Sequence, residues 1–593
     1  MSKFERLSLT RLPQLTAENL GAVMAERLAA VKSTSTSIPM LWQGLLEMNV
    51  NTAEGPRTAK LYVPKDTPQG TAFAILNIPA GVDSLAFLEE SGWIACSDRL
   101  GLPLCAAEPG PGGWRSPAQE QGYIDACVQA LFAGIHLRAG MSIYVVGYGE
   151  IGQCLHRYVL DNPLRIAAAA FLDASGLAEA VIENAEAARL DVGESRFDLM
   201  KREIPVPVWI LEKQPDARSE RAAAHWRKAI QAGDAMQDPL WGTVYAQTRE
   251  SVCTPDGPIA KVCVTVSDEA CTSPAMTEKL CSFLRRYARY NKFGPYGNSL
   301  VPYADYEALG VELRRFPDDN CELRECLVYV PRAFQGKGKL PLIFAIHGSS
   351  ESVRNYLEES LLYRKADKEG FIVVMPETKL YFMPDELSGG VPMAYRPRWE
   401  FCRGVRTDKR EAEHDLHFYE RVLDAVCAEY PVDTSRIYGT GHSNGFMMIS
   451  LMASSPCGAR FAAAAMTSGI TPIWDETGTA RIPVWMTMGE YDLWSYRLED
   501  ETGLTAGIDA WLQRNGLADE RSAREKRLSG ADESYTDGRH HVSLWKDGQG
   551  QPMLRYDWIE MKDHMNTAEE NLRFWDEWFS HWSLGESGIR RYV

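Results

Sequence analysis

Short apolar runs alternate with amphipathic stretches along the chain. In the first half, apolar runs of strand length lie at 45–50, 59–64, 72–78, 102–107 and 142–147. Stretches with helical spacing lie between them, at 84–91 and 122–136. Continuous apolar strands that alternate with helices are typical of a mostly parallel sheet with helices on both faces. The pattern therefore predicts the α/β class.

The second half of the chain repeats features of the first half in the same order. The paired segments are Tyr62–Pro64 with Tyr329–Pro331, 72–78 with 342–346, Asp98–Gly101 with Asp367–Gly370, Ser142–Gly149 with Ser435–Ser443, and Pro207–Trp209 with Pro483–Trp485. An ordered set of this kind indicates one domain that is present twice. The segment 291–298 is rich in glycine, proline and asparagine, as linkers are. We predict two tandem α/β domains, at 1–295 and 296–593.

Size and charge restrict the classes of partner. The chain has 593 residues, 45% of them hydrophobic, which suits two hydrophobic cores better than one. Its formal net charge is -17 and its pI is about 5.3. A strongly acidic protein is repelled by phosphate-rich surfaces, so we expect neither nucleic acid nor a membrane as a partner. The expected partner is a small molecule, and the sequence leaves the formation of a homo-oligomer undecided.

Targeting signals and cysteine spacing favour the cytoplasm. The sequence has no run of about 18 uncharged apolar residues that would predict a membrane-spanning helix. The start, Met1–Arg6, leads into polar residues rather than the apolar core of a signal peptide. The 13 cysteines lie singly, without a C-x-x-C pair or zinc-ligand spacing. Such an odd, unpatterned set is typical of reduced thiols, so we expect a cytoplasmic protein.

One stretch carries a nucleophile motif. Gly441-His-Ser-Asn-Gly445 has the form G-x-S-x-G, and it lies between an apolar strand and a predicted helix. On a sharp strand-to-helix turn the serine hydroxyl projects from the backbone, and the glycines let the helix pass close behind it. The helix N-terminus places amide groups where an oxyanion would form. The alternative interpretation is a glycine-rich turn, so the partners of Ser443 decide between the two.

A serine nucleophile needs a base, and the base needs an acid that orients it. With the chain order serine, acid, histidine, the acid is expected just beyond a strand that follows the serine. An apolar run ends in Gly489-Glu-Tyr-Asp492, which makes Asp492 the expected acid. Glu490 is the main alternative, and Asp500 and Asp475 are weaker ones. Asp492 also fits a helix N-cap.

The base is expected in a short strand-to-helix loop near the end of the chain. A strand-like run leads into Lys562-Asp-His564, with a helical pattern behind it, so His564 is the expected base. His540 and His541 lie in a charged region, and we expect both to be solvated. His581 is expected on the face of the last helix.

An acyl-transfer site also needs two backbone N–H donors for the oxyanion. One is expected from Asn444, the residue after the serine. The other is expected from Ser349, in the loop that follows a buried strand. Two histidines lie near these positions in the sequence: His347 is expected to shape the loop, and His442 is expected to pack.

The first copy lacks the reactive groups of the second. Gly149 stands where the second copy has Ser443, and Glu269 stands where it has His564. Gly147-Tyr-Gly-Glu-Ile-Gly152 is similar to a dinucleotide-binding loop, but the repeat already explains it as an altered serine turn. We therefore predict that the first domain is a catalytically inactive scaffold.

The second copy carries an insertion. Glu377 lies 269 positions after Glu108, whereas Phe418 lies 295 positions after Tyr123, so the second copy has 26 more residues in between, within 378–417. The insertion follows a strand on the side of the sheet where ligands bind, so we interpret it as a lid or pocket wall, with a surface loop as the alternative. The expected substrate contacts in the insertion and just past the acid are Tyr381, Tyr395, Arg396, Arg398, Trp399, Trp494 and Tyr496.

Residues from about 322 to 566 resemble the polyhydroxybutyrate-depolymerase-like and feruloyl-esterase-like branch of the α/β-hydrolases. The resemblance is carried by Leu342–Gly348, Gly370–Pro376 and Val432–Met448, above all by the run S-N-G-x-M-M. The first half resembles this branch only through the repeat. The resemblance implies two tandem α/β-hydrolase-like domains. In the second, it implies a serine esterase with the site residues Ser443, Asp492, His564, Ser349 and Asn444.

Two departures from that branch bear on the substrate. Its glycine-rich approach to the histidine is replaced by Met561-Lys-Asp-His564, and its usual secretion signal is absent. Both favour a small soluble ester over a polymer, with aromatic or hydroxycinnamoyl esters among the candidates. The expected reaction passes through an acyl-enzyme and needs no metal or organic cofactor. The alternatives are a prolyl-oligopeptidase-like peptidase, a polyester depolymerase and a non-catalytic binding scaffold.

Overall fold

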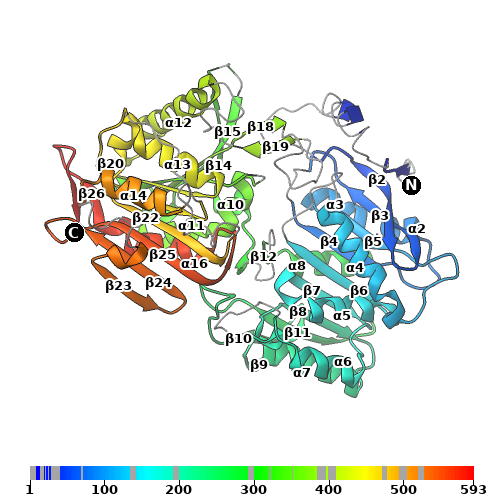
Figure 1. Cartoon of the computed structure of the whole chain (residues 1–593). Helices are drawn as coiled ribbons and strands as arrows, with labels where there is room; N and C mark the ends of the chain where they lie inside the picture. Colours follow the sequence, from blue (N-terminus) through cyan, green and yellow to red (C-terminus); the bar gives the residue numbers. More distant parts are fainter. Residues whose placement is uncertain are drawn as a thin grey trace.

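The computed structural model covers most of the chain. It describes residues 9–13, 19, 22–23, 26–27, 40–67, 71–133, 142–190, 199–290, 299–319, 321, 323–349, 351–382, 395–398, 409–469, 477–492, 504–517 and 527–592. At 132–133, 379–382, 395–398, 409–414, 504 and 527–528 it describes the backbone alone. The described residues form two α/β domains, each built on a large sheet (Figure 1).

The first sheet has eleven strands in the order β1-β2-β3-β5-β4-β6-β7-β8-β11-β10-β9. Its strands are β1 (Thr10–Arg11), β2 (Gly44–Thr52), β3 (Gly55–Val63), β4 (Phe73–Asn77), β5 (Leu104–Ala107), β6 (Ile143–Tyr148), β7 (Ile166–Leu172), β8 (Val208–Glu212), β9 (Ala232–Asp238), β10 (Gly242–Gln247) and β11 (Lys261–Val266). The helices of this domain are α2 (Ser84–Glu90), α3 (Trp93–Leu100), α4 (Pro117–Ala133), α5 (Gln153–Asp161), α6 (Glu179–Ala187), α7 (Ala217–Ala229) and α8 (Pro274–Leu284).

The second sheet has ten strands in the order β14-β15-β17-β16-β20-β21-β22-β25-β24-β23. Its strands are β14 (Glu312–Pro317), β15 (Leu323–Tyr329), β16 (Leu340–Ile346), β17 (Ile372–Pro376), β20 (Val432–His442), β21 (Ala463–Thr467), β22 (Val484–Tyr491), β23 (Glu533–Asp537), β24 (His540–Lys546) and β25 (Pro552–Asp563). The helices are α9 (Tyr306–Leu309), α10 (Val353–Ser360), α11 (Leu362–Glu369), α12 (Lys409–Glu429), α13 (Asn444–Ser454), α14 (Leu504–Arg514) and α16 (Ala568–Glu577).

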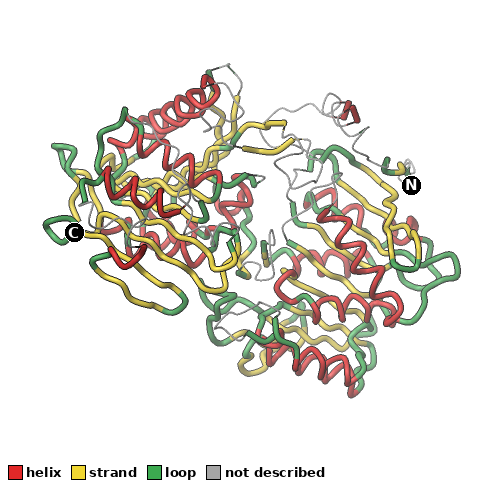
Figure 2. The backbone as a smooth tube through the Cα atoms, in the orientation of Figure 1, coloured by secondary structure: helices red, strands yellow, loops and turns green. Residues whose placement is uncertain are grey.

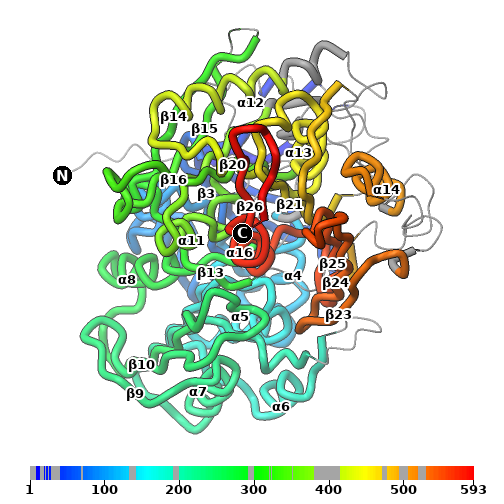
Figure 3. The backbone as a smooth tube through the Cα atoms, turned by 90° about the vertical axis from the view of Figure 1, so that its left-hand side faces the viewer, coloured from blue at the N-terminus to red at the C-terminus, as the bar shows by residue number. Residues whose placement is uncertain are grey.

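The strand order from β2 to β9 in the first sheet corresponds, position by position, to the order from β14 to β23 in the second. The directions correspond as well. In each sheet the six central strands are parallel, and antiparallel strands lie at both edges. Helices cover both faces of each sheet (Figure 2), and β23, β24 and β25 form one edge of the second (Figure 3). The predicted fold class, two α/β domains that each have a mostly parallel sheet with helices on both faces, is confirmed.

The central strands follow from their composition. In β4, β7, β16 and β21 every residue is buried, because helices cover both faces and leave no polar side to these strands. Each domain has its own large apolar core. The predicted boundary between 295 and 296 lies outside the described residues.

Three pairs of strands lie outside the large sheets. β12 (Tyr287–Arg289) pairs with β13 (Leu300–Pro302), and β26 (Trp582–Leu584) pairs with β27 (Arg590–Tyr592). β18 (Lys379–Phe382) pairs with β19 (Tyr395–Arg398), within the predicted insertion. Among the described residues, helices long and apolar enough to cross a membrane are absent.

The two domains touch at several polar and apolar contacts. Asp256 of the first domain forms ion pairs with Arg364 and Lys368 of the second. Near the end of β25, Leu190 and Leu199 of the first domain pack on Met561. The backbone of Met561 has φ of 54°, a left-handed conformation that a non-glycine residue seldom adopts.

Candidate active site

The predicted nucleophile lies on a sharp turn between β20 and α13. Ser443 has φ of 53° and ψ of -111°, and its backbone N–H donates to the Thr467 carbonyl at 3.0 Å. A left-handed serine between a strand and a helix is the strained geometry that lifts the hydroxyl out of the backbone. The side chain is partly exposed, so a substrate has access to it.

The flanking glycines are required by close backbone approaches. A Cβ on Gly441 would lie 2.4 Å from the Gly445 carbonyl oxygen. A Cβ on Gly445 would lie 2.1 Å from the Ile346 carbonyl oxygen, at the end of β16. The start of α13 therefore passes within backbone contact of both β20 and β16, which is the packing that the G-x-S-x-G pattern permits.

The structure brings the three predicted polar side chains together. Ser443 Oγ lies 2.8 Å from His564 Nε2, and His564 Nδ1 lies 3.0 Å from Asp492 Oδ1. The three residues follow the ends of β20, β22 and β25, so the parallel sheet delivers them to one edge. His564 is 5% exposed and Asp492 is 3% exposed. The chain of hydrogen bonds can pass a proton from the serine hydroxyl to the imidazole.

Asp492 is ionised in this arrangement. Burial alone would raise the pKa of Asp492, but the charge and hydrogen bond of His564, with the charge of Lys562 and the Ser468 hydroxyl, outweigh burial and lower it. The alternative acid, Glu490, accepts a hydrogen bond from the Met561 backbone N–H at 2.9 Å and so braces the loop instead. Asp475 and Asp500 lie outside the described residues.

The two expected oxyanion donors lie at the expected elements. Asn444 is the first residue of α13, and Ser349 lies in the turn after β16. The neighbouring N–H of Gly348 donates to Glu351. Glu351 also lies 2.9 Å from His442 Nδ1. The carboxylate thus ties the loop to the strand that carries the nucleophile.

The buried histidines beside the site hold structure in different ways. His347 Nε2 lies 2.7 Å from Glu377, and its Nδ1 lies 2.8 Å from the Gly348 carbonyl oxygen, which agrees with a loop-shaping role. His442 was expected only to pack, but it forms a buried pair with Glu351. Its ring centroid lies 5.2 Å from that of His564.

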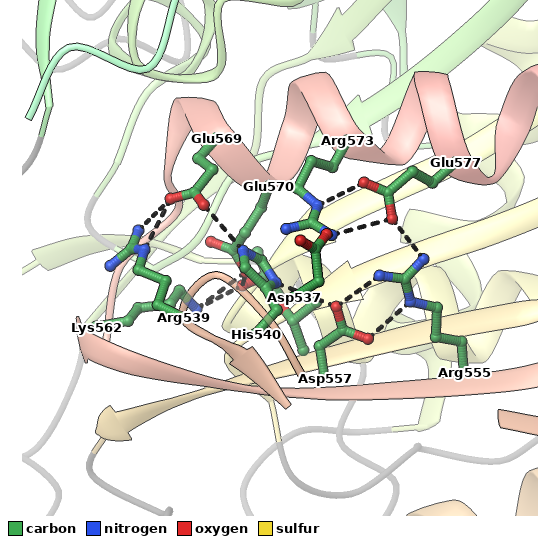
Figure 4. Close-up of polar contacts among 12 residues, drawn as sticks. Asp537, Arg539, His540, Arg555, Asp557, Lys562, Glu569, Glu570, Arg573 and Glu577 are labelled. Carbon is green, nitrogen blue, oxygen red and sulfur yellow. Dashed lines mark hydrogen bonds and ion pairs between the residues drawn. The ribbon is translucent and has the colours of Figure 1, made fainter. Parts of the chain in front are cut away.

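The expectation that His540 and His541 are solvated is wrong. His540 is 1% exposed and lies 3.1 Å from Asp557 and 3.0 Å from Glu569 (Figure 4). Burial opposes protonation, but the hydrogen bonds and charges of these two carboxylates outweigh burial and raise the pKa of His540. His541 is partly buried and bonds to Glu560. The charged region is an ionic network between β24, β25 and α16 rather than a solvated face.

All seven predicted substrate contacts lie where side chains are not described. Tyr381 pairs with Arg396 in the β18–β19 hairpin, whose other members include Tyr395 and Arg398. For these four residues the structure gives the backbone alone. Trp399, Trp494 and Tyr496 lie outside the described residues, as do 383–394 and 399–408 of the predicted lid.

The first domain has the same turn without the reactive group. Gly149 follows β6 with φ of 62°, and its N–H donates to the Leu172 carbonyl at 2.8 Å, as Ser443 donates to Thr467. Asn77 exchanges two hydrogen bonds with the backbone of Tyr148 beside this turn. Glu269 forms an ion pair with Lys279 at 2.7 Å.

Two buried charges near the triad were missed in the sequence. Glu351 follows the predicted oxyanion loop, and Lys562 lies two residues before His564. Met561 and Lys562 lie in a bulge, because Gly489 to Tyr491 of β22 pairs with Ile559 to Asp563 of β25, leaving two extra residues on β25. The segment before Lys562, Leu554–Met561, mixes apolar and charged residues, and nothing in it marks the lysine as buried.

Comparisons with known proteins identify structures of similar fold. The chain matches no protein-family model and no curated protein. It is similar to an acetyl xylan esterase from Aspergillus awamori, with 16% identity over 45% of this chain and 99% of that one, at a TM-score of 0.33. It is also similar to the poly(3-hydroxybutyrate) depolymerase LpqC from Bordetella parapertussis, with 17% identity, 45% and 90% coverage and a TM-score of 0.29.

The chain is also similar to an S-formylglutathione hydrolase from Agrobacterium tumefaciens. The identity is 14% over 49% of this chain and 93% of that one, at a TM-score of 0.28. The resemblance drawn from the sequence is confirmed as a resemblance of fold. Because one fold carries many reactions, the reaction of this chain has to be inferred from its own side chains.

Proposed function

We propose that the second domain is a serine hydrolase that cleaves a small carboxylic ester through an acyl-enzyme. The observation that carries the proposal is the continuous chain from Ser443 Oγ to His564 at 2.8 Å and from His564 to Asp492 at 3.0 Å. Each member lies at the end of a parallel strand, and the serine lies on a left-handed turn at a helix N-terminus. This is the arrangement that acyl transfer by a serine requires.

The residues would act in a defined order. His564 Nε2 takes the proton of Ser443 as the hydroxyl attacks the ester carbonyl, and Asp492 stabilises the imidazolium that forms. The N–H groups of Asn444 and Ser349 receive the oxyanion. His564 then protonates the leaving alcohol, and a water molecule activated by the same imidazole releases the acid.

The first domain is a catalytically inactive copy in this proposal. Gly149 at the turn supplies no nucleophile, and Glu269 is engaged with Lys279. The expected substrate contacts in the insertion and after Asp492 are rich in aromatic residues, which favours an aromatic or apolar acyl or alcohol group.

The test compares wild type with Ser443→Ala on p-nitrophenyl and hydroxycinnamoyl esters and on aminoacyl amides, together with labelling by a fluorophosphonate. Wild type is expected to hydrolyse an ester and to be labelled, and the variant is expected to lose both. The Ser534→Ala variant, which removes a serine hydroxyl on the exposed edge strand β23, serves as the control that should still be labelled. Hydrolysis of amides alone would replace the esterase by a peptidase, and an unlabelled wild type would favour a binding scaffold.

A further inference from the structure

A buried cation lies behind the candidate triad. Lys562 is 2% exposed, and its Nζ lies 2.8 Å from Thr467 Oγ1, 2.7 Å from Ser468 Oγ and 3.2 Å from Glu570 Oε1. An ammonium group has three protons, so these three contacts use all of its donors. The bulge in β25 and the left-handed Met561 turn this side chain inward.

The carboxylate partner is equally enclosed. Glu570 is 1% exposed and accepts hydrogen bonds from the hydroxyls of Thr467 and Thr567, both at 2.7 Å, and from Thr487. Burial alone would raise the pKa of Glu570, but the charge of Lys562 and these hydroxyls outweigh burial and lower it. A buried ion pair, even when fully bonded, stabilises a fold little more than apolar residues of the same volume. Its position therefore calls for a functional explanation.

Ser468 connects the pair to the triad. This serine follows β21, is fully buried and has φ of 56°, a strained conformation that the surroundings must impose. Its hydroxyl contacts Lys562, and the hydroxyl and the ammonium together help to lower the pKa of Asp492. Lys562 also lies only two residues before His564, so the same side chain anchors the loop that carries the base.

We propose that Lys562, held in place by Glu570, is a positioning residue that keeps the Asp492–His564 pair ready to accept the serine proton. The inference rests on the proposed function. A positive charge beside the pair opposes the protonation of Asp492, which then stays the anion that orients His564. Lys562 acts through Ser468 and Asp492 and does not touch the substrate.

The test is the pH dependence of kcat/KM and of the rate of fluorophosphonate labelling. The acid limb of such a profile is its low-pH side, where the rate rises as pH rises. Lys562→Met removes the positive charge at similar side-chain volume, and this limb is expected to move to higher pH by about one unit. Below the limb the rate then falls about tenfold, while well above it the rate stays within about threefold. Glu570→Gln leaves the cation without its counter-charge and is expected to move the limb to lower pH. Opposite movements of the limb separate a charge effect from damage to the fold.

A second variant and a control make the result independent of stability. Lys562→Met leaves Glu570 buried without a counter-charge, so the double variant Lys562→Met/Glu570→Gln is made as well. Its limb is expected to move in the direction of the lysine variant by a smaller amount, because Lys562 rather than Glu570 shares Ser468 with Asp492. The control is Arg555→Met, which removes another buried cation of β25, at the opposite end of the network in Figure 4.

The outcomes separate the two proposals. Limb movements in the lysine and glutamate variants, with the arginine control unmoved, support the positioning role. If wild type is labelled, and the Lys562→Met and double variants have their acid limb at the same pH as wild type, this inference is overturned. The proposed function then still stands. A wild type that is labelled at no pH overturns both.

Discussion

The approach of α13 to β16 gives a prediction whose size follows from the geometry. A Cβ added at Gly445 would lie 2.1 Å from the Ile346 carbonyl oxygen and 2.8 Å from that of His347. Ordinary contact begins at about 3.4 Å, so the helix start and the loop after β16 must separate by about 1.3 Å. That movement parts the two expected oxyanion donors, because one belongs to each element. A misplacement of about 1 Å at a catalytic group costs about 100-fold in rate.

Gly445→Ala is therefore expected to lower kcat for a p-nitrophenyl ester about 100-fold, with a smaller change in KM, because ground-state binding does not use the oxyanion contacts. Steady-state kinetics on the folded variant, verified by circular dichroism, measure the effect. Gly548→Ala is the matched control, since a Cβ there meets nothing within 4 Å, and its kinetics should equal those of wild type. A Gly445→Ala enzyme within threefold of wild type in kcat would refute the reasoning.

Two further predictions concern the acid and the first domain. Asp492→Asn is expected to lower kcat by about 10⁴-fold, because an amide favours the wrong imidazole tautomer; a loss below tenfold, with a larger one in Glu490→Gln, would transfer the role to Glu490. In the first domain, burial and the charge of His225 lower the pKa of His156 to about 3. The unfolded state, with a pKa near 6.5, therefore binds the proton first, and stability falls as pH drops between about 6.5 and 3. Between pH 7 and 4.5, His156→Gln is expected to lose about 2.5 kcal/mol less unfolding free energy than wild type in urea titrations, and equal losses would contradict it.

The fold and the meeting of Ser443, Asp492 and His564 are predictable because both follow from patterns along the chain. Runs such as Leu340–Ile346 are apolar throughout, since helices cover both faces of the strand, and this marks a parallel sheet. Parallel strands then bring the residues after their ends to one edge, so the chain order of serine, acid and histidine was enough to select Asp492 and His564. Helix α4 begins at Pro117, before the predicted 122, and the proline at its first turn was the signal for that start.

The buried charges could not be predicted in the same way. The contacts that bury Lys562 come from Thr467 and from Glu570, which lie on a different strand and on a helix, and no local pattern records them. His540 lies among charged residues in the sequence, which ordinarily indicates a solvated face. In the fold, however, the carboxylates that pair with His540 are Asp557 of β25 and Glu569 of α16, which are distant in the sequence. Local composition reports how polar a segment is, but the neighbours that pair its charges are set by the tertiary structure.

The contact of Leu190 and Leu199 with Met561 joins the first domain to the segment that leads to His564. A left-handed methionine costs about 1–3 kcal/mol, and here the first domain and Glu490 hold it three residues before His564. The contact between the domains thus helps to hold the segment that carries His564. Because coupling between two equilibria is reciprocal, a ligand that orders that loop must tighten the domain contact by the same factor. Ligand binding at that loop and association of the two domains would then be linked.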